Sequence, residues 1–147
     1  MLSGNALELQ FEKQSLDGIQ ALRMLHFLRP FEVRVFFENA AKWLKSGGLL
    51  CVTVGTPYIA VAVGTVRPEY ERKKANNEEW PGEITEEMAA ICWPEGISCK
   101  QGYLFDKETL ERETIRAGLR IIRCEYLARE FAFTNGKENL GLLAEKL

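Results

Sequence analysis

The 147-residue sequence lacks a marked excess of charge of either sign. Its 19 lysines and arginines nearly balance its 21 acidic residues, which gives a net charge of −2. A chain without a basic excess has no electrostatic footprint for nucleic acid or an anionic membrane surface. No apolar run reaches the roughly 18 residues of a membrane-spanning helix, and the first residues lack the order of a signal peptide. We therefore expect a cytoplasmic protein with neither nucleic-acid nor membrane partners.

The sequence is also poor in metal-binding residues. His26 is its only histidine, and six residues separate Cys92 from Cys99, which is not the spacing of a zinc knuckle. Cys51 and Cys124 lie in apolar, strand-like runs, where a thiol behaves as a small buried hydrophobe. We therefore expect no metal site and interpret all four cysteines as reduced structural residues.

What is present is the composition of an ordinary globular protein, with 46% hydrophobic and 27% charged residues. A chain of this length forms a single domain, residues 1–147, with a core of its own. Its most regular pattern runs from residue 15 to residue 57 and reads as strand, helix, turn and strand.

The segment 15–57 predicts one βαβ unit. A first strand, 18–22, is followed by a helix that begins near Pro30 and that Gly47 would end as a left-handed cap. Leu49 to Val54 is an uninterrupted apolar run, typical of a strand buried on both faces of a parallel sheet. Strand, helix and parallel strand join by a right-handed crossover. The buried stripe of the helix would consist of Val33, Phe36, Phe37, Ala40, Ala41 and Leu44.

The second half of the chain contains another amphipathic helix, over residues 106–118. Asp106 is suited to cap its N-terminus, because a carboxylate there accepts a hydrogen bond from the backbone two or three residues later. The spacing favours Leu110 and Ile115 on the apolar side and Glu113 among the charges that face solvent. We therefore expect this helix to pack on a sheet through one stripe.

Two further strands are predicted over residues 120–126 and 140–147, and the Asn-Gly pair at 135–136 favours a hairpin between them. Residues 58–103 follow no clear period and include a charge-dense stretch that a solvated helix would explain. The first part of that segment, 58–66, is compatible with either a helix start or a loop. Together these features predict an α/β fold with a mixed sheet of about four strands.

The segment 15–57 resembles the class I S-adenosylmethionine-dependent methyltransferases of methyltransferase type 11. The resemblance rests on an Asp near a strand start, then Leu-His-Phe-Leu at 25–28, then Trp-Leu-Lys-Ser-Gly-Gly-Leu-Leu at 43–50. It implies the fourth strand, fourth helix and fifth strand of that Rossmann-like fold, followed by a C-terminal hairpin that places the last strand between the fifth and the sixth. Only the C-terminal half of the family's domain is covered, with 58–103 at the place of a lid-like insertion over the substrate.

The resemblance also implies cofactor-binding positions. In the family, an Asp-Ala pair after the third strand lies beside the adenine of S-adenosylmethionine, and Asn5 and Ala6 take that place here, with the acid replaced. Ala21, Leu22 and Arg23 match the residues beyond the fourth strand, where the backbone meets the methionine end of the cofactor. Packing alone would also explain these three residues.

His26 and Tyr58 are the candidate residues on the substrate side. Tyr58 follows the predicted fifth strand, where it would overlook the substrate in the resembling enzymes. His26 has the chemistry of a general base, although its place in a Leu-His-Phe-Leu turn favours a structural, hydrogen-bonded side chain. The sequence assigns no catalytic residue.

No G-x-G motif occurs in these residues. In the family, a glycine-rich turn after the first strand and an acid after the second hold the ribose and methionine of the cofactor. That part of the fold is expected before Met1, so the strand 18–22 would keep an open edge, and open edges pair with other chains. We therefore predict either a homodimer through the Gly18–Leu22 edge or association with a separate N-terminal half.

Two functions follow from this sequence. The first is an S-adenosylmethionine-dependent, methyltransferase-like protein of the small-molecule type, inactive alone because the glycine-rich cofactor loop is missing. The alternative is a non-catalytic dimerisation or regulatory module derived from a methyltransferase. Binding of the cofactor by the purified chain would distinguish the two.

Overall fold

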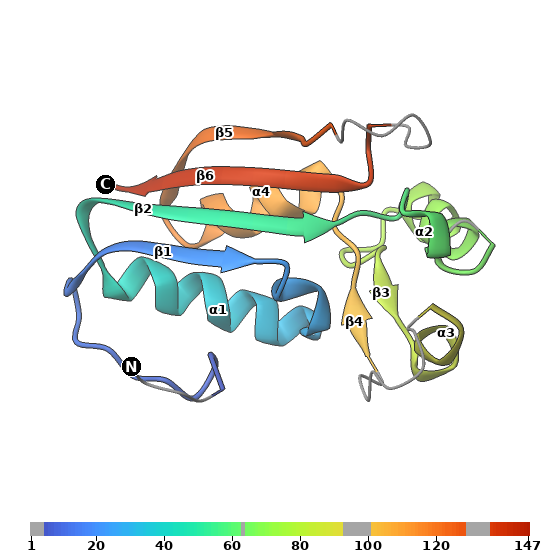
Figure 1. Ribbon diagram of the computed structural model, residues 1–147, viewed down its shortest axis with the longest axis horizontal. Helices are drawn as coiled ribbons and strands as arrows, with labels where there is room; N and C mark the ends of the chain where they lie inside the picture. Colours follow the sequence, from blue (N-terminus) through green and yellow to red (C-terminus); the bar gives the residue numbers. More distant parts are fainter. Residues whose placement is uncertain (1–4, 63, 93–100, 129–135) are drawn as a thin grey trace.

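A computed structural model describes residues 5–62, 64–92, 101–128 and 136–147 (Figure 1). Its centre is a four-stranded mixed sheet, and a second, two-stranded sheet lies beyond one end of the strands. In chain order the elements are β1 (Leu16–Leu22), η1 (Leu25–Phe27), α1 (Pro30–Trp43), β2 (Leu44–Gly55), η2 (Ala60–Ala62), α2 (Val66–Ala75), β3 (Glu83–Ile84), α3 (Glu86–Cys92), β4 (Gly102–Tyr103), α4 (Lys107–Arg116), β5 (Leu119–Tyr126) and β6 (Asn139–Lys146).

The strand order in the main sheet is β1-β2-β6-β5. β1 is parallel to β2, whereas β6 is antiparallel to both β2 and β5. The mixed α/β sheet of four strands is therefore confirmed, and so is the placement of the last strand, β6, between β2 and β5. Of the Asn-Gly pair expected in the hairpin, Gly136 has a positive φ of 72°, and position 135 lies outside the described residues.

The βαβ unit of β1, α1 and β2 is confirmed, but the predicted end of its helix is wrong. α1 ends at Trp43, and Leu44 is already extended and pairs with Leu16. The next partner pair is Gly18 with Leu49, so four residues of β2 lie opposite one residue of β1. Gly47, with φ 79°, turns this irregular stretch of β2 instead of capping the helix.

The prediction that β2 is buried on both faces is also wrong. Leu50, Val52 and Val54 are fully buried, and they belong to one core cluster with residues of α1 and α4. Leu49, on the opposite face of the strand, is 42% exposed, and Cys51 is only partly buried. Helices therefore cover one face of the sheet, which we call the covered face, and the opposite face is the open face.

α4 confirms its predicted cap and corrects its predicted orientation. The side chain of Asp106 accepts a hydrogen bond from the N–H of Thr109 at 2.9 Å. Glu113, expected in solvent, is buried, whereas Ile115, expected in the core, is 64% exposed. The buried stripe follows the i, i+3, i+4 spacing that starts at Leu110, and Glu113 lies on it.

The structure also bears on the cysteines, on metal-ligating side chains and on membrane-spanning helices. Cys124 is buried as expected, while Cys51 lies partly exposed on the open face. Cys99 and the side chain of Cys92 lie outside the described residues. Within the described ranges, no three metal-ligating side chains gather at one place, and no helix has the length and apolar character to cross a bilayer.

Candidate functional site

β1 and β2 finish side by side at one end of the sheet, and α2, β3, α3 and β4 lie beyond that end (Figure 1). Arg23 directly follows β1 and has a φ of 55°, a left-handed conformation that side chains other than glycine rarely adopt. Its N–H donates to the carbonyl of Thr53 at 2.8 Å, and its guanidinium donates to the side-chain oxygen of Asn139. Arg23 is therefore held at the strand ends by β2 and β6 together.

His26 lies three residues further on, in η1, and is buried. Burial, and then the positive charge of Arg23, lower the pKa of His26 to about 4. The imidazole is therefore neutral at pH 7 and a weak proton acceptor, because an efficient general base has a pKa near the working pH. Its ring packs on Phe27 with 4.2 Å between ring centroids.

Tyr58 lies just past the end of β2. Its N–H donates to the hydroxyl of Thr56 at 3.2 Å, and that hydroxyl donates to the carbonyl of Lys137. The guanidinium of Arg67 lies 5.0 Å from the centre of the Tyr58 ring, and the ammonium of Lys137 lies 5.7 Å from it. The ring edge meets Tyr70 of α2, so Tyr58 links the end of β2 to α2 between two cations.

A pocket of about 260 Å³ opens at these strand ends. Of the sequence-predicted site residues, Arg23 lines it, and His26 and Tyr58 do not. The described residues that line it are Arg23, Thr53, Leu127, Ala128 and Asn139. The pocket therefore combines one cation with a side-chain amide and a hydroxyl, a set that hydrogen-bonds a polar ligand.

A second cavity, of about 430 Å³, lies along the outer edge of β1, and we call it the β1-edge cavity. Ala6 and Ala21, predicted from positions far apart in the chain, both line it. The other lining residues are Leu9, Phe11, Leu16, Gly18, Ile19, Gln20, Met24, Phe36 and Trp43. Of the side chains described in its walls, all but Gln20 are apolar, and its volume falls in the range of small-molecule sites.

The remaining two candidate cofactor residues lie elsewhere. The side chain of Asn5 accepts from the N–H of Leu7 and donates to Glu8, both at 3.1 Å, and so closes a local turn. Leu22 is 55% exposed on the open face of the sheet. The structure thus brings Ala6 and Ala21 together and places Asn5, Leu22 and Arg23 in three other surroundings.

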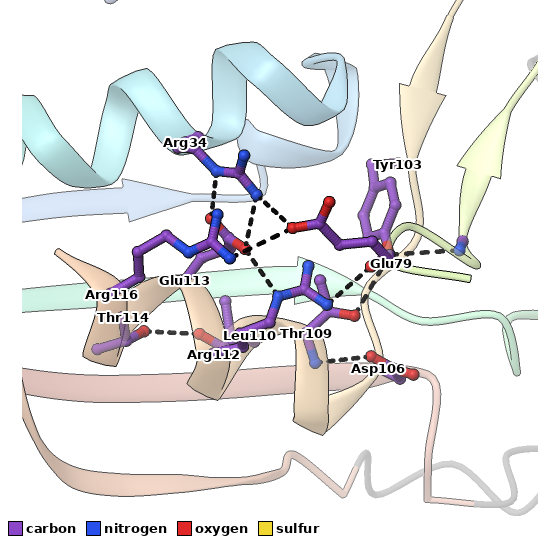
Figure 2. A network of polar contacts seen from close by, with 11 residues as sticks. Arg34, Glu79, Tyr103, Asp106, Thr109, Leu110, Arg112, Glu113, Thr114 and Arg116 are labelled. Atoms are coloured by element: carbon purple, nitrogen blue, oxygen red, sulfur yellow. Dashed lines mark hydrogen bonds and ion pairs between the residues drawn. The ribbon is translucent and has the colours of Figure 1, made fainter. Parts of the chain in front are cut away.

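A network of arginines and glutamates, which sequence reasoning missed, joins the two covering helices to the segment after α2 (Figure 2). The buried carboxylate of Glu113 pairs with Arg34 of α1 at 3.1 Å and with Arg112 at 2.8 Å. Glu79 pairs with Arg34 at 2.7 Å and with Arg116 at 3.3 Å. Burial alone would raise the pKa of Glu113, but the hydrogen bonds from Arg34 and Arg112 outweigh it and lower that pKa.

Trp80 lies against the same arginines. The guanidinium carbon of Arg34 lies 5.3 Å from its ring centre and that of Arg112 lies 4.9 Å from it. The ring edge of Trp80 meets Tyr103 of β4. The sequence signal that could have found this network is the place of Glu113 on the apolar stripe of α4, since a charge there needs partners from a neighbouring element.

Asp106 links the start of α4 to α2. Besides capping α4, its carboxylate accepts from the hydroxyl of Tyr70 at 3.1 Å and from the ammonium of Lys74 at 3.0 Å. Burial would raise the pKa of Asp106, but the hydrogen bonds from Thr109 and Lys74 outweigh burial and lower that pKa. α2 is therefore fixed to the start of α4, and the segment from α2 to Glu79 is anchored at two points.

Comparison with known proteins gives three structures of the same architecture. A sequence model described as the methyltransferase domain matches residues 1–52. An S-adenosylmethionine-dependent methyltransferase from Methanosarcina mazei superposes with a TM-score of 0.67 at 17% identity, over 98% of this chain and 65% of that one. The fold of the present chain is therefore part of a class I methyltransferase fold.

Two further methyltransferases show the same partial coverage. The S-adenosylmethionine-dependent enzyme from Mesorhizobium loti gives a TM-score of 0.64 at 17% identity, over 97% of this chain and 67% of that one. The 1,6-didemethyltoxoflavin-N1-methyltransferase of Burkholderia thailandensis was solved with bound 1,6-didemethyltoxoflavin and S-adenosylhomocysteine. It gives a TM-score of 0.60 at 14% identity, over 99% of this chain and 49% of that one. No curated protein matches. The chain thus spans about half to two thirds of the length of these structures.

The methyltransferase fold raises the question of whether these residues fit S-adenosylmethionine. The apolar β1-edge cavity is suited to a flat base. Among the described residues, no carboxylate lines it to accept the two ribose hydroxyls, and no G-x-G turn is present in the sequence to approach the methionine end. The residues present therefore fit the base of the cofactor and do not fit its ribose or amino-acid parts.

Proposed function

We propose that this chain supplies the adenine-side and substrate-side walls of an S-adenosylmethionine-dependent methyltransferase for a small molecule. The observation that carries the proposal is the β1-edge cavity, in which Ala6 and Ala21 meet within a methyltransferase fold. S-adenosylmethionine supplies an electrophilic methyl group, and catalysis of this kind depends mainly on holding a nucleophile in line with it. Because only the base of the cofactor finds a fitting wall, these residues by themselves do not sustain methyl transfer.

The substrate side of the proposal rests on the strand ends. Arg23 and Asn139 line a polar pocket there, and Tyr58 lies nearby with its ring between Arg67 and Lys137. An aromatic ring and hydrogen-bonding groups suit a small molecule that has both a flat and a polar part. We extend the proposal to a cytoplasmic location, in keeping with the unbridged thiols of Cys51 and Cys124.

The test is a titration of the 15N-labelled chain with adenosine and, separately, with S-adenosylhomocysteine, followed by NMR. The expected result is weak binding of both ligands with similar affinity, because both share the base, with shifts confined to amides around the β1-edge cavity. Shifts that avoid Ala6, Ala21 and Met24, or no shifts at millimolar ligand, would overturn the placement of the base. Micromolar affinity for S-adenosylhomocysteine alone would overturn the claim that the ribose and methionine lack a site.

A matched pair of variants sharpens this titration. Ala6→Leu adds volume inside the cavity and is expected to abolish the shifts. Ala75→Leu makes the same change at an exposed position of α2 and is expected to leave them unaltered. Equal responses of both variants to adenosine would contradict the proposed site.

A second function, a non-catalytic dimerisation or regulatory module, is favoured by a different observation. Of the strands that the structure describes, only β2 pairs with β1, and part of the sheet's open face is apolar. Absence of any nucleoside binding, together with a stable dimer, would favour this module over the enzyme. Ligand titration and sedimentation together therefore distinguish the two proposed functions.

A further inference from the structure

The outer edge of β1 presents backbone groups that no described strand uses. The N–H of Arg23 donates to Thr53 of β2, and successive residues of a strand point their N–H and C=O to opposite sides. Ala21 and Ile19 therefore face β2, whereas Gly18, Gln20 and Leu22 direct their backbone groups away from it. This gives an unpaired edge with three donors and three acceptors.

The two edges of the sheet differ in how they are protected. β5, at the far edge, carries Arg120, Arg123 and Glu125, and its pairing with β6 is irregular between Ile121 and Arg123. Charges and bulges are the usual devices that keep an edge strand from pairing with another chain. From Gly18 to Leu22, β1 pairs regularly with β2 and carries no charge. β1 is therefore the edge that is open to a partner strand.

The side chains of β1 show a self-complementary pattern. On the open face, Leu22 is 55% exposed and Gly18 offers no side chain, with Gln20 midway between them. The chain itself does not require glycine at position 18, because a Cβ there would meet only the carbonyl of Leu49, at 3.6 Å. Leu22 and Gly18 each lie two residues from Gln20. A two-fold rotation about Gln20 would therefore place the large side chain of Leu22 over the glycine of the other copy.

We propose that two copies of this chain join through β1 in an antiparallel pair, with Gln20 on the two-fold axis. In this register Gln20 lies opposite its own copy, and each Leu22 lies opposite the partner copy's Gly18, over which its side chain can pack. All three outward-facing residues then form hydrogen-bonded pairs across the interface. Ile19 and Ala21 lie opposite each other on the covered face, so both apolar and polar faces continue across the axis.

Charge supports the same register. Asp17, the second residue of β1, has an exposed carboxylate whose described partner is Lys45, and Arg23 follows the strand. Antiparallel pairing about Gln20 brings Asp17 of one copy next to Arg23 of the other, at both ends of the interface. The guanidinium of Arg23 already donates to Asn139 of β6, so the two opposite charges favour this register by their proximity and not through a direct ion pair. An isologous interface of this kind closes as a dimer and extends no further.

The first test is sedimentation equilibrium of the 147-residue chain over a concentration series, with two matched variants. Leu22→Lys places a charge on the β1 edge, and Ile122→Lys makes the same change on the β5 edge, where Ile122 is 47% exposed. The expected result is a dimer that Leu22→Lys weakens by at least about tenfold and that Ile122→Lys changes by less than about twofold. A monomer, or a dimer sensitive only to Ile122→Lys, would overturn the proposal.

The second test reads the register directly by amide hydrogen exchange at two protein concentrations. The amides of Gly18, Gln20 and Leu22 are expected to be protected in the dimer and to exchange faster on dilution. The amides of Ile19 and Ala21, which face β2, are expected to be protected at both concentrations. Identical protection of the two sets at all concentrations would contradict pairing through this edge.

A third variant, Gly18→Val, separates this inference from the proposed function. The added side chain has room within one copy but would occupy the space of the partner copy's Leu22, so the dimer is expected to weaken while circular dichroism stays unchanged. Adenosine titration of Leu22→Lys, whose position does not line the β1-edge cavity, reports on the cavity independently. A separate N-terminal half, or a preceding segment that adds a strand to β1, would compete with the dimer, and a complex with such a strand in place of the dimer would overturn the inference.

Discussion

The two faces of β2 are built from similar residues and have different surroundings. Leu50, on the covered face, is fully buried among residues of α1 and α4, while its neighbour Leu49 is 42% exposed. The same contrast holds between Val52, which is buried, and the partly exposed Cys51. An apolar run therefore indicates that a strand is suited to two-sided burial, but the covering layer has to come from elsewhere in the chain or from a partner.

The largest expected effect comes from truncating the two neighbouring leucines of β2. Leu50→Ala leaves a cavity between the sheet and its helices and is expected to lower the free energy of unfolding by about 2–5 kcal/mol. Leu49→Ala removes a side chain from the open face and is expected to cost less than about 1 kcal/mol. Urea denaturation of both variants measures the difference. Equal losses would mean that the open face is covered in solution.

A second effect concerns the buried His26 at the end of β1. Its pKa is about 4 in the folded chain and near 6.5 when unfolded, so the unfolded state takes up its proton first as the pH falls. Stability from this residue is therefore complete above pH 6.5 and is lost progressively towards pH 4, by about 3 kcal/mol in all. Denaturation of the wild type and of His26→Gln across this range tests it. A wild-type profile as flat as that of the variant would contradict the buried, neutral histidine.

The arginine–glutamate network fixes the two covering helices to each other, and Glu113 is its buried member. Glu113→Gln leaves Arg34 and Arg112 without their carboxylate and is expected to cost about 1–3 kcal/mol, since both arginines remain partly solvated. Glu111→Gln on the same helix is the control, with less than about 0.5 kcal/mol.

The network also has a pH signature. Because the pKa of folded Glu113 is lowered, its contribution is present above the unfolded value and is lost as the pH falls through the folded one. The free energy of unfolding of Glu113→Gln should therefore fall less steeply with decreasing pH than that of the wild type. The difference is expected at the acid end of the profile, beyond most of the range in which His26 titrates. An unchanged acid limb would show that the carboxylate is not paired in solution.

The smallest effect is expected at the start of α4. Asp106→Ala removes the hydrogen bond to the N–H of Thr109 and the ion pair with Lys74, and we expect a loss of about 1 kcal/mol. Asp17→Ala, which removes an exposed ion pair with Lys45, is the control at less than about 0.5 kcal/mol. Thermal unfolding followed by circular dichroism distinguishes the two. Equal shifts would place Asp106 in solvent.

The elements that sequence reasoning predicted well are those that local periodicity determines. The βαβ unit and the Asp106 cap follow from spacing, and the position of β6 follows from the family resemblance. The irregular stretch that contains Gly47 was missed because it depends on the register between β1 and β2. The burial of Glu113 was missed because its partner Arg34 lies 79 positions away.

The candidate site was predicted in part for a similar reason. Ala6 and Ala21 do meet at one cavity, but that cavity is closed by α1 residues such as Phe36, which the sequence marks only as core. Arg23 was placed at the strand ends correctly, and its contact with Asn139 spans 116 positions. Contacts over such separations depend on how the whole sheet assembles, and no local pattern contains them.

β6 is the only strand that joins β2 to β5, and it comes last of the described elements. During synthesis the chain emerges from the ribosome beginning with its N-terminus, so the βαβ unit and α4 leave the exit tunnel while β6 is still within it. Until that strand arrives, β2 is paired with β1 alone and keeps one unpaired edge, and β5 has no partner. The nascent chain therefore passes through a stage in which its sheet is divided, and a chaperone that protects it would have to act during that stage.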